Sequence, residues 1–226
     1  MAITDFTTLR NEIQVYAARS DSVFSNRIET FVAFAEDRIY SGAGRGEQDP
    51  LYSEPLRTKV MEGEATLTFA DSGSGYSTAT LPEDATDFRK IARDGDQEGI
   101  SFLEPKFFME RTAQLSSGST PSFYTVEAGV LKLAPSYVGD IQVSYWKRFS
   151  ALSIDAPTND LLTAFPLVYL NACMYEAFSF MQEPNEALGW LARYRSQVAG
   201  LNKTASSARY PGRMQIRPRR VIGGKG

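Results

Sequence analysis

The sequence contains no histidine and only one cysteine among its 226 residues. Without histidine, the protein cannot build a Ser-His-Asp or Cys-His nucleophile and cannot ligate a metal through imidazole. One cysteine excludes an internal disulfide and a CxxC zinc or redox site. Long apolar runs are also missing, since the most apolar window, 161–181, carries Glu176. Burying that charge in hydrocarbon would be costly, so we predict a buried helix and no membrane contact.

Acidic residues are absent from the end of the chain. From Lys203 onward there are seven basic residues and no acid, whereas the first 202 residues hold 17 basic and 27 acidic residues, a net of −10. The basic residues alternate with apolar ones in runs that favour an extended conformation. This pattern favours β-strand addition to a partner's sheet edge, with arginines pairing with acids of the partner. Contact with DNA phosphates and a solvated tail remain the alternatives.

Helical periodicity is present at both ends of the chain. Apolar stripes predict a helix over 5–19 and a second over 21–40. Near the C-terminus, a third helix is predicted over 159–181 and a fourth from Pro184 to about residue 201. The apolar residues of the third helix cover most of its circumference. It therefore needs cover on two sides, from its own bundle and from a neighbouring subunit.

In the middle of the chain, the spacing of apolar residues changes from the helical period to the two-residue period of a β-strand. Alternation in 65–69 and 77–81, on either side of a turn-like 71–75, predicts a hairpin. The other expected elements are a strand at 88–93, a helix at 105–115, and a meander of strands at 123–126, 130–133 and 141–146.

These elements predict an α+β fold. An antiparallel helix bundle is expected from residues 1–45 and 158–208, with a small antiparallel β domain inserted at 46–157. Residues 209–226 are expected to form an extended basic C-terminal tail, because prolines and glycines there prevent a regular element.

Candidate chemical sites are weak. The glycines at 42–46 follow a helix and precede a polar loop, which is typical of a connector rather than a phosphate cradle. Glu36 and Asp37 diverge on a helix and do not form a catalytic pair. Cys173 has no histidine to activate it, so we predict an inert core thiol. Glu176 is expected either to pair with an arginine or to face a polar subunit contact. We predict no catalytic, metal or cofactor site.

Several short segments follow one another in an order that is typical of one group of proteins. They are 31–39, 56–62, 81–84 before 88–91, 118–124 before 131–135, 145–148, 152, 159–162, 165–166, 169–170, 176–177 and Trp190. With these segments the chain, over residues 5–201, resembles the head-to-tail adaptor (connector) proteins of tailed bacteriophages, especially those of short-tailed phages.

The resemblance implies a structural virion protein without enzymatic activity. Such adaptors assemble in the host cytoplasm as a dodecameric ring under the portal protein. They extend the DNA channel, help to retain the genome, and attach the tail nozzle or tail fibres. Genomic DNA passes through without sequence-specific binding. An acidic body suits such a channel wall, because like charge keeps DNA from sticking.

The resemblance also implies that the C-terminal segment reaches along the portal. The residues expected to dock there are Arg209, Arg213, Met214, Ile216, Arg217, Arg219, Arg220, Val221 and Ile222. Two other functions stay open. A peptidoglycan-degrading, lysozyme-like virion protein would need a glutamate of raised pKa near a second carboxylate in a cleft. A DNA-binding protein would use the basic tail.

Overall fold

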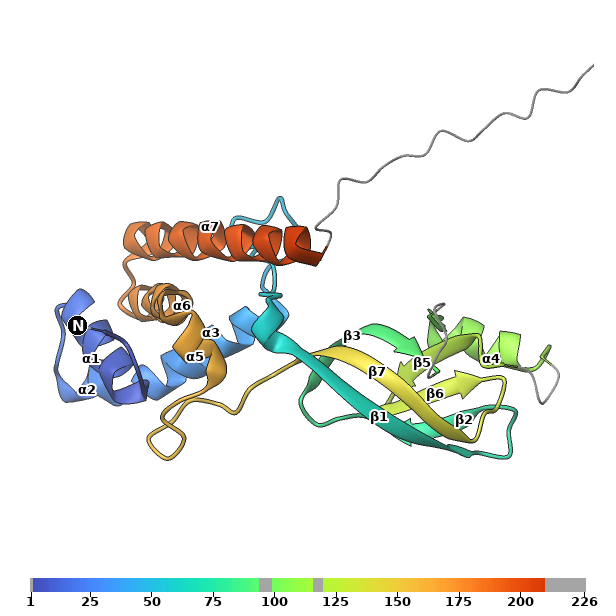
Figure 1. Ribbon diagram of the computed structural model, residues 1–226. Coiled ribbons are helices and arrows are strands. Elements are labelled where there is room, and N and C mark those ends of the chain that lie inside the picture. The colour runs from blue at the N-terminus through green and yellow to red at the C-terminus, as the bar shows by residue number, and fades with distance from the viewer. Residues whose placement is uncertain (1, 94–98, 116–119, 210–226) are drawn as a thin grey trace, which may run out of the picture.

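The computed structural model describes residues 2–93, 99–115 and 120–209, with helices at both ends and a sheet between them (Figure 1). The helices are α1 (Phe6–Tyr16), α2 (Ser22–Ser25), α3 (Ile28–Ser41), α4 (Pro105–Thr112), α5 (Asp160–Ala164), α6 (Pro166–Phe180) and α7 (Pro184–Arg209), and a 3-10 turn occupies Lys59–Met61. The strands are β1 (Glu62–Asp71), β2 (Ser77–Thr80), β3 (Ala85–Ala92), β4 (Ser101–Phe102), β5 (Phe123–Glu127), β6 (Val130–Ala134) and β7 (Gly139–Lys147).

Short polar side chains start three of the helices. Asp5 accepts a hydrogen bond from the Thr8 amide at 2.8 Å, and Asp21 and Asn159 cap α2 and α5 in the same way. Each long helix that the sequence predicts after Asp21 and after Asn159 is divided in two. In the second case Pro166 takes the first position of α6, where its missing amide hydrogen costs nothing.

The helices pack in layers around α6. In Figure 1, α6 is seen nearly end-on between α7 on one side and α3 on the other, which both lie lengthwise. Its side chains are buried nearly all round, among them Tyr169, Cys173 and Met174. α6 is therefore covered on two sides by its own chain.

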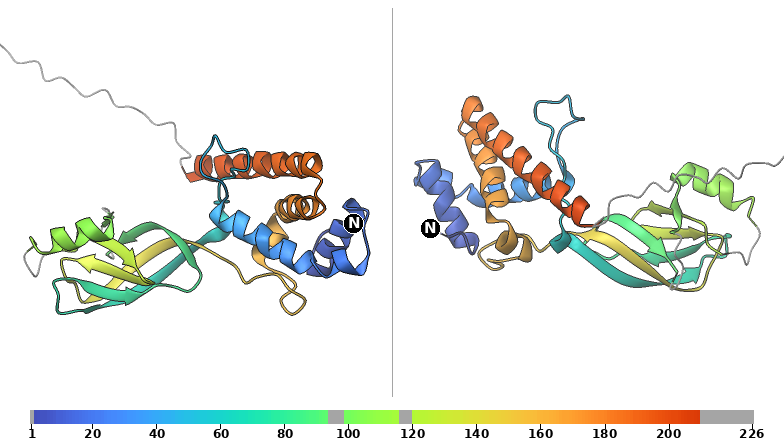
Figure 2. Two further views of the ribbon diagram at one scale, coloured as in Figure 1. Left: turned by 180° about the vertical axis from the view of Figure 1, so that it is seen from behind. Right: turned by 45° about the horizontal axis from the view of Figure 1, so that its top comes forward.

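The strands form a seven-stranded mixed sheet in the order β3-β7-β1-β2-β6-β5-β4. β4 pairs with β5 in parallel, and the other pairs are antiparallel. The sheet curls into a nearly closed barrel with α4 beside it (Figure 2). Its core is separate from that of the helices and is built around Phe69, Leu131, Ile141 and Val143.

The expected fold class, an antiparallel helix bundle with a small inserted antiparallel β domain, is wrong. The β part is a mixed seven-stranded sheet, and α6 crosses α3 and α7 instead of running antiparallel to them. A helix that is apolar all round can be buried at many crossing angles. Its sequence pattern therefore predicts that it is buried, but not the angle at which it crosses its neighbours.

The expected meander is also wrong, because β7 lies between β1 and β3 instead of next to β6. Ile141 and Val143 of β7 share a core with Phe69 of β1 and Ile91 of β3. Pairing with β6 would remove β7 from these two strands. Within the described part of the chain, no helix is both long and apolar enough to cross a bilayer.

Candidate functional site

An apolar groove lies on the helical part, where α3, α6 and the start of α7 meet the loop before β1. It consists of two adjoining hollows of about 420 Å³ and about 380 Å³, which share Ser179 of α6. We call it the helical groove, and four of the large apolar side chains that line it are exposed: Phe34, Leu51, Phe180 and Leu188. Exposed apolar side chains gathered at a hollow are typical of a protein–protein contact.

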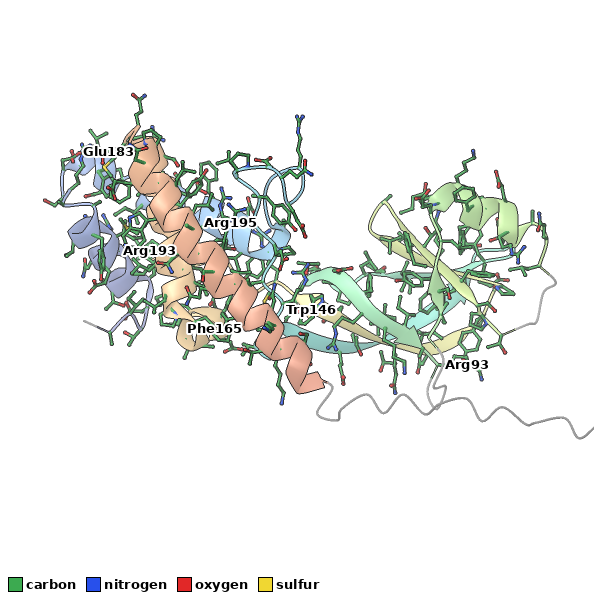
Figure 3. All side chains as sticks on the ribbon, turned by 90° about the horizontal axis from the view of Figure 1, so that it is seen from above. Arg93, Trp146, Phe165, Glu183, Arg193 and Arg195 are labelled. Atoms are coloured by element: carbon green, nitrogen blue, oxygen red, sulfur yellow. The ribbon has the colours of Figure 1, made fainter. Side chains whose placement is uncertain are left out.

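The loop from 42 to 58 is held where it can contribute to this groove. Gly42 and Gly44 both have positive φ, and a Cβ on Gly44 would lie 2.6 Å from the Tyr52 Cα. The loop is fixed to α7 by the Arg195 guanidinium, which donates to the Pro50 carbonyl at 3.1 Å (Figure 3). The glycines thus serve a folded connector that carries Leu51 to the groove. The connector agrees with the sequence, but the contribution of Leu51 to a groove was not predicted; the available signal was an apolar residue in an otherwise polar loop.

A largely buried ion pair lies beside the groove. The Arg38 guanidinium of α3 donates to the Glu176 carboxylate of α6 at 3.0 Å and 3.2 Å, and the two side chains are 12% and 14% exposed. Arg38 also lies 4.3 Å from the centre of the Tyr175 ring. Burial raises the pKa of the Glu176 carboxyl, and the charge of Arg38 opposes that rise. Glu176 therefore pairs with an arginine, one of the two roles the sequence left open.

The same ion pair has an unused donor. Among the described residues, no partner accepts a hydrogen bond from the buried Arg38 Nη1. Glu176 itself lines the groove.

A second buried carboxyl fixes the segment after β7 to the helices. Glu36 of α3 is 1% exposed and accepts hydrogen bonds from the Leu152 amide at 3.0 Å and from the Tyr169 hydroxyl at 3.3 Å. The Tyr169 oxygen accepts in turn from Asn159. Burial raises the pKa of Glu36, although both hydrogen bonds lower it. Glu36 is thus a structural acceptor at the join between the two parts of the molecule.

Replacing Glu36 with glutamine should flatten part of the pH dependence of stability. Because its folded pKa is raised, Glu36 favours folding most at low pH, and this contribution falls as the pH rises through the folded pKa. Glutamine keeps the acceptor oxygen without a charge. The variant should match or exceed the parent in urea unfolding at pH 8 and lose that advantage near pH 4.

The alanine variant at this position is the control. Glu36→Ala leaves the Leu152 amide without its acceptor and should destabilise the protein by about 1–3 kcal/mol at either pH. Equal losses for glutamine and alanine at pH 8 would contradict the structural role.

Neither buried glutamate matches a glycosidase acid. Glu36 is enclosed and accepts two hydrogen bonds at its Oε1, and Glu176 is held by Arg38. A lysozyme-like site needs a protonated acid and a second carboxylate that both face an open cleft. Cys173 is buried on α6, and burial raises the pKa of its thiol, as expected for a core residue.

The basic tail predicted at residues 209–226 lies almost entirely outside the described residues. Arg209 is the last residue of α7. The other eight residues of the predicted docking set lie outside the described residues: Arg213, Met214, Ile216, Arg217, Arg219, Arg220, Val221 and Ile222.

The family whose model is described as SU10 adaptor protein matches residues 4–219. The match includes the helical part, the sheet and most of the basic tail. No curated protein matches the chain.

Proposed function

Because the chain belongs to the SU10 adaptor protein family, we propose that it is a structural subunit of a ring that joins the head of a phage to its tail. The ring, dodecameric as in the adaptors it resembles, docks under the portal, continues the DNA channel, and presents a surface to the tail nozzle or fibres. The family is one of phage adaptors, so the protein is a virion component with portal and tail proteins as its partners.

The helical groove is the structural observation that best supports the proposed ring. A closed ring needs two different, complementary faces on every subunit. We take the groove as one such face, because it is hollow, apolar and lined by exposed side chains such as Phe34 and Leu188.

The charge of the body supports the channel role. The first 202 residues carry a net charge of −10. A ring lined by acidic residues repels the phosphate backbone and lets DNA slide without sequence-specific contacts. The protein should therefore bind duplex DNA weakly at physiological salt.

The ring is tested by mixing the protein with its portal. Negative-stain images should show an added layer of density beneath the portal ring, and light scattering should show oligomers of the protein. A protein that stays monomeric and never joins the portal would contradict the proposal. Turnover of peptidoglycan by the purified protein would contradict its non-enzymatic part.

Deleting residues 213–226 should abolish portal binding and leave a folded body. Without this segment the protein loses five of its seven C-terminal basic residues, including every arginine after Arg209. Arginine pairs readily with carboxylates on a partner, so affinity should fall at least roughly 100-fold, the loss of two or more such contacts. Co-sedimentation with portal particles measures this loss.

A shorter deletion is the matched control. Removing only 223–226 spares every residue of the predicted docking set and should keep portal binding. Equal binding by the two truncated proteins would show that the tail is not the docking element.

A further inference from the structure

The barrel has an opening in its wall between β3 and β5. β3 ends the strand order on one side, and on the other side the two-residue β4 pairs only with Phe123 and Tyr124, so Val126 lies beyond it. The segment after β2 closes one end of the opening, where the Leu81 amide donates to Gly129. The segment before β4 closes the other end, where the Ile100 amide donates to Ile91.

We call this opening the barrel window. It encloses about 490 Å³ and is lined by Leu81, Ala85, Phe88, Phe102, Tyr124 and Val126, with Asp87 at its rim. Phe88 and Phe102 both lie edge-to-face with Tyr124, at ring-centre distances of 6.5 Å and 5.4 Å. Phe102 is exposed, and Phe88, Tyr124 and Val126 are only partly buried against the sheet core. The window therefore opens the barrel core to solvent beside an unpaired strand edge.

A sheet edge beside an open apolar core is suited to β-strand addition. The added strand pairs through its main chain and directs every second side chain inward. For this window the inward residues must be apolar and the outward residues polar or charged. The window is lined by residues 85–88 of β3, so a strand of about five residues, about 17 Å long, would cover it.

One segment of the chain has this pattern. Between Pro211 and Pro218 lie six residues in which Met214 and Ile216 alternate with Arg213, Gln215 and Arg217. The two prolines limit the segment to the length of the window, because proline interrupts a strand ladder. Its arginines would lie on the outer face, where Asp87 is exposed.

We infer that residues 213–217 of one copy add as a β-strand to the barrel window of a neighbouring copy. Met214 and Ile216 point into the sheet core, and the backbone pairs with the free edge of β3. This inference rests on the proposed ring, since it requires a neighbour. It assigns the first half of the tail to a sister subunit and leaves Arg219–Ile222, beyond Pro218, for the portal.

Disulfide trapping between two full-length proteins tests the inference. One protein carries Gln215→Cys, and the other carries either Asp87→Cys or Lys90→Cys on the exposed side of β3. The native Cys173 is buried and will not interfere. Oxidation of the mixture should give a dimer with one chain of each kind, because a disulfide needs Cα atoms within about 7 Å. Thr158→Cys, in an exposed loop outside the sheet, should give roughly tenfold less.

Changes within the tail make the test specific. Ile216→Asp should abolish the cross-link, because it puts a charge into the apolar window, while Arg220→Asp should leave it intact. Absence of the mixed dimer, or a cross-link only when both cysteines are on one chain, would overturn the inference. Light scattering and portal binding of the same samples report separately on the proposed ring, which can hold even where the strand exchange fails.

Discussion

Replacing Phe34 with aspartate is expected to leave a folded monomer that no longer associates with other copies. Phe34 lies on α3 in the helical groove and is 55% exposed, so the substitution removes little of the core. In the assembled ring the same position would be desolvated, and an unpaired carboxylate there is strongly unfavourable. Central interface residues of this kind contribute about 2–4 kcal/mol, which corresponds to roughly 30- to 1,000-fold weaker association.

Light scattering over a range of protein concentrations measures this change, and circular dichroism confirms that the helices persist. Val138→Asp is the matched control, because Val138 is 69% exposed in the turn before β7, outside the helical groove. It adds the same charge and should not change self-association. If the Phe34 variant assembles as the parent does, the groove is not the contact between copies.

Replacing Arg38 with alanine should destabilise the monomer by about 3–5 kcal/mol. The change leaves Glu176 largely buried without its cation, and Glu176 cannot reach water easily because its side chain is 14% exposed. The stacking of Arg38 on Tyr175 is lost as well. Urea unfolding followed by fluorescence gives the change in the free energy of unfolding.

Two controls separate the pair from other effects. The double variant Arg38→Met, Glu176→Met removes both charges and should recover most of the loss, as buried pairs replaced by apolar residues commonly do. Arg19→Ala breaks the exposed Arg19–Asp21 pair, whose side chains are each 43% exposed, and should change stability by less than about 1 kcal/mol. A small loss for Arg38→Ala would mean that Glu176 is stabilised without its partner.

Local features of the fold could be predicted from the sequence, whereas its long-range pairings could not. The helix starts at Asp21 and Asn159 depend on neighbours three residues away, and the strand alternation in β1 and β2 depends on residues within one element. The position of β7 depends on which strands share its core, far along the chain. Periodicity contains no information about that choice.

The candidate sites divide in the same way. The basic tail could be found because its composition alone is unusual. The helical groove could not, since it combines Phe34, Leu51 and Leu188 from three separate segments. The sequence shows Glu176 as a charged residue on an apolar helix, but its partner Arg38 lies 138 residues earlier, and only the folded chain brings the two together.

The join between the two parts of the molecule has a mechanical consequence. β1 and β7 run side by side through eight residue pairs, and Trp146, near the end of β7, packs into the helical core (Figure 3). A pull that draws the barrel away from the helices would stretch both strands along their length. The paired strands would resist such tension, because they are already extended and Trp146 fixes their end to the helical core.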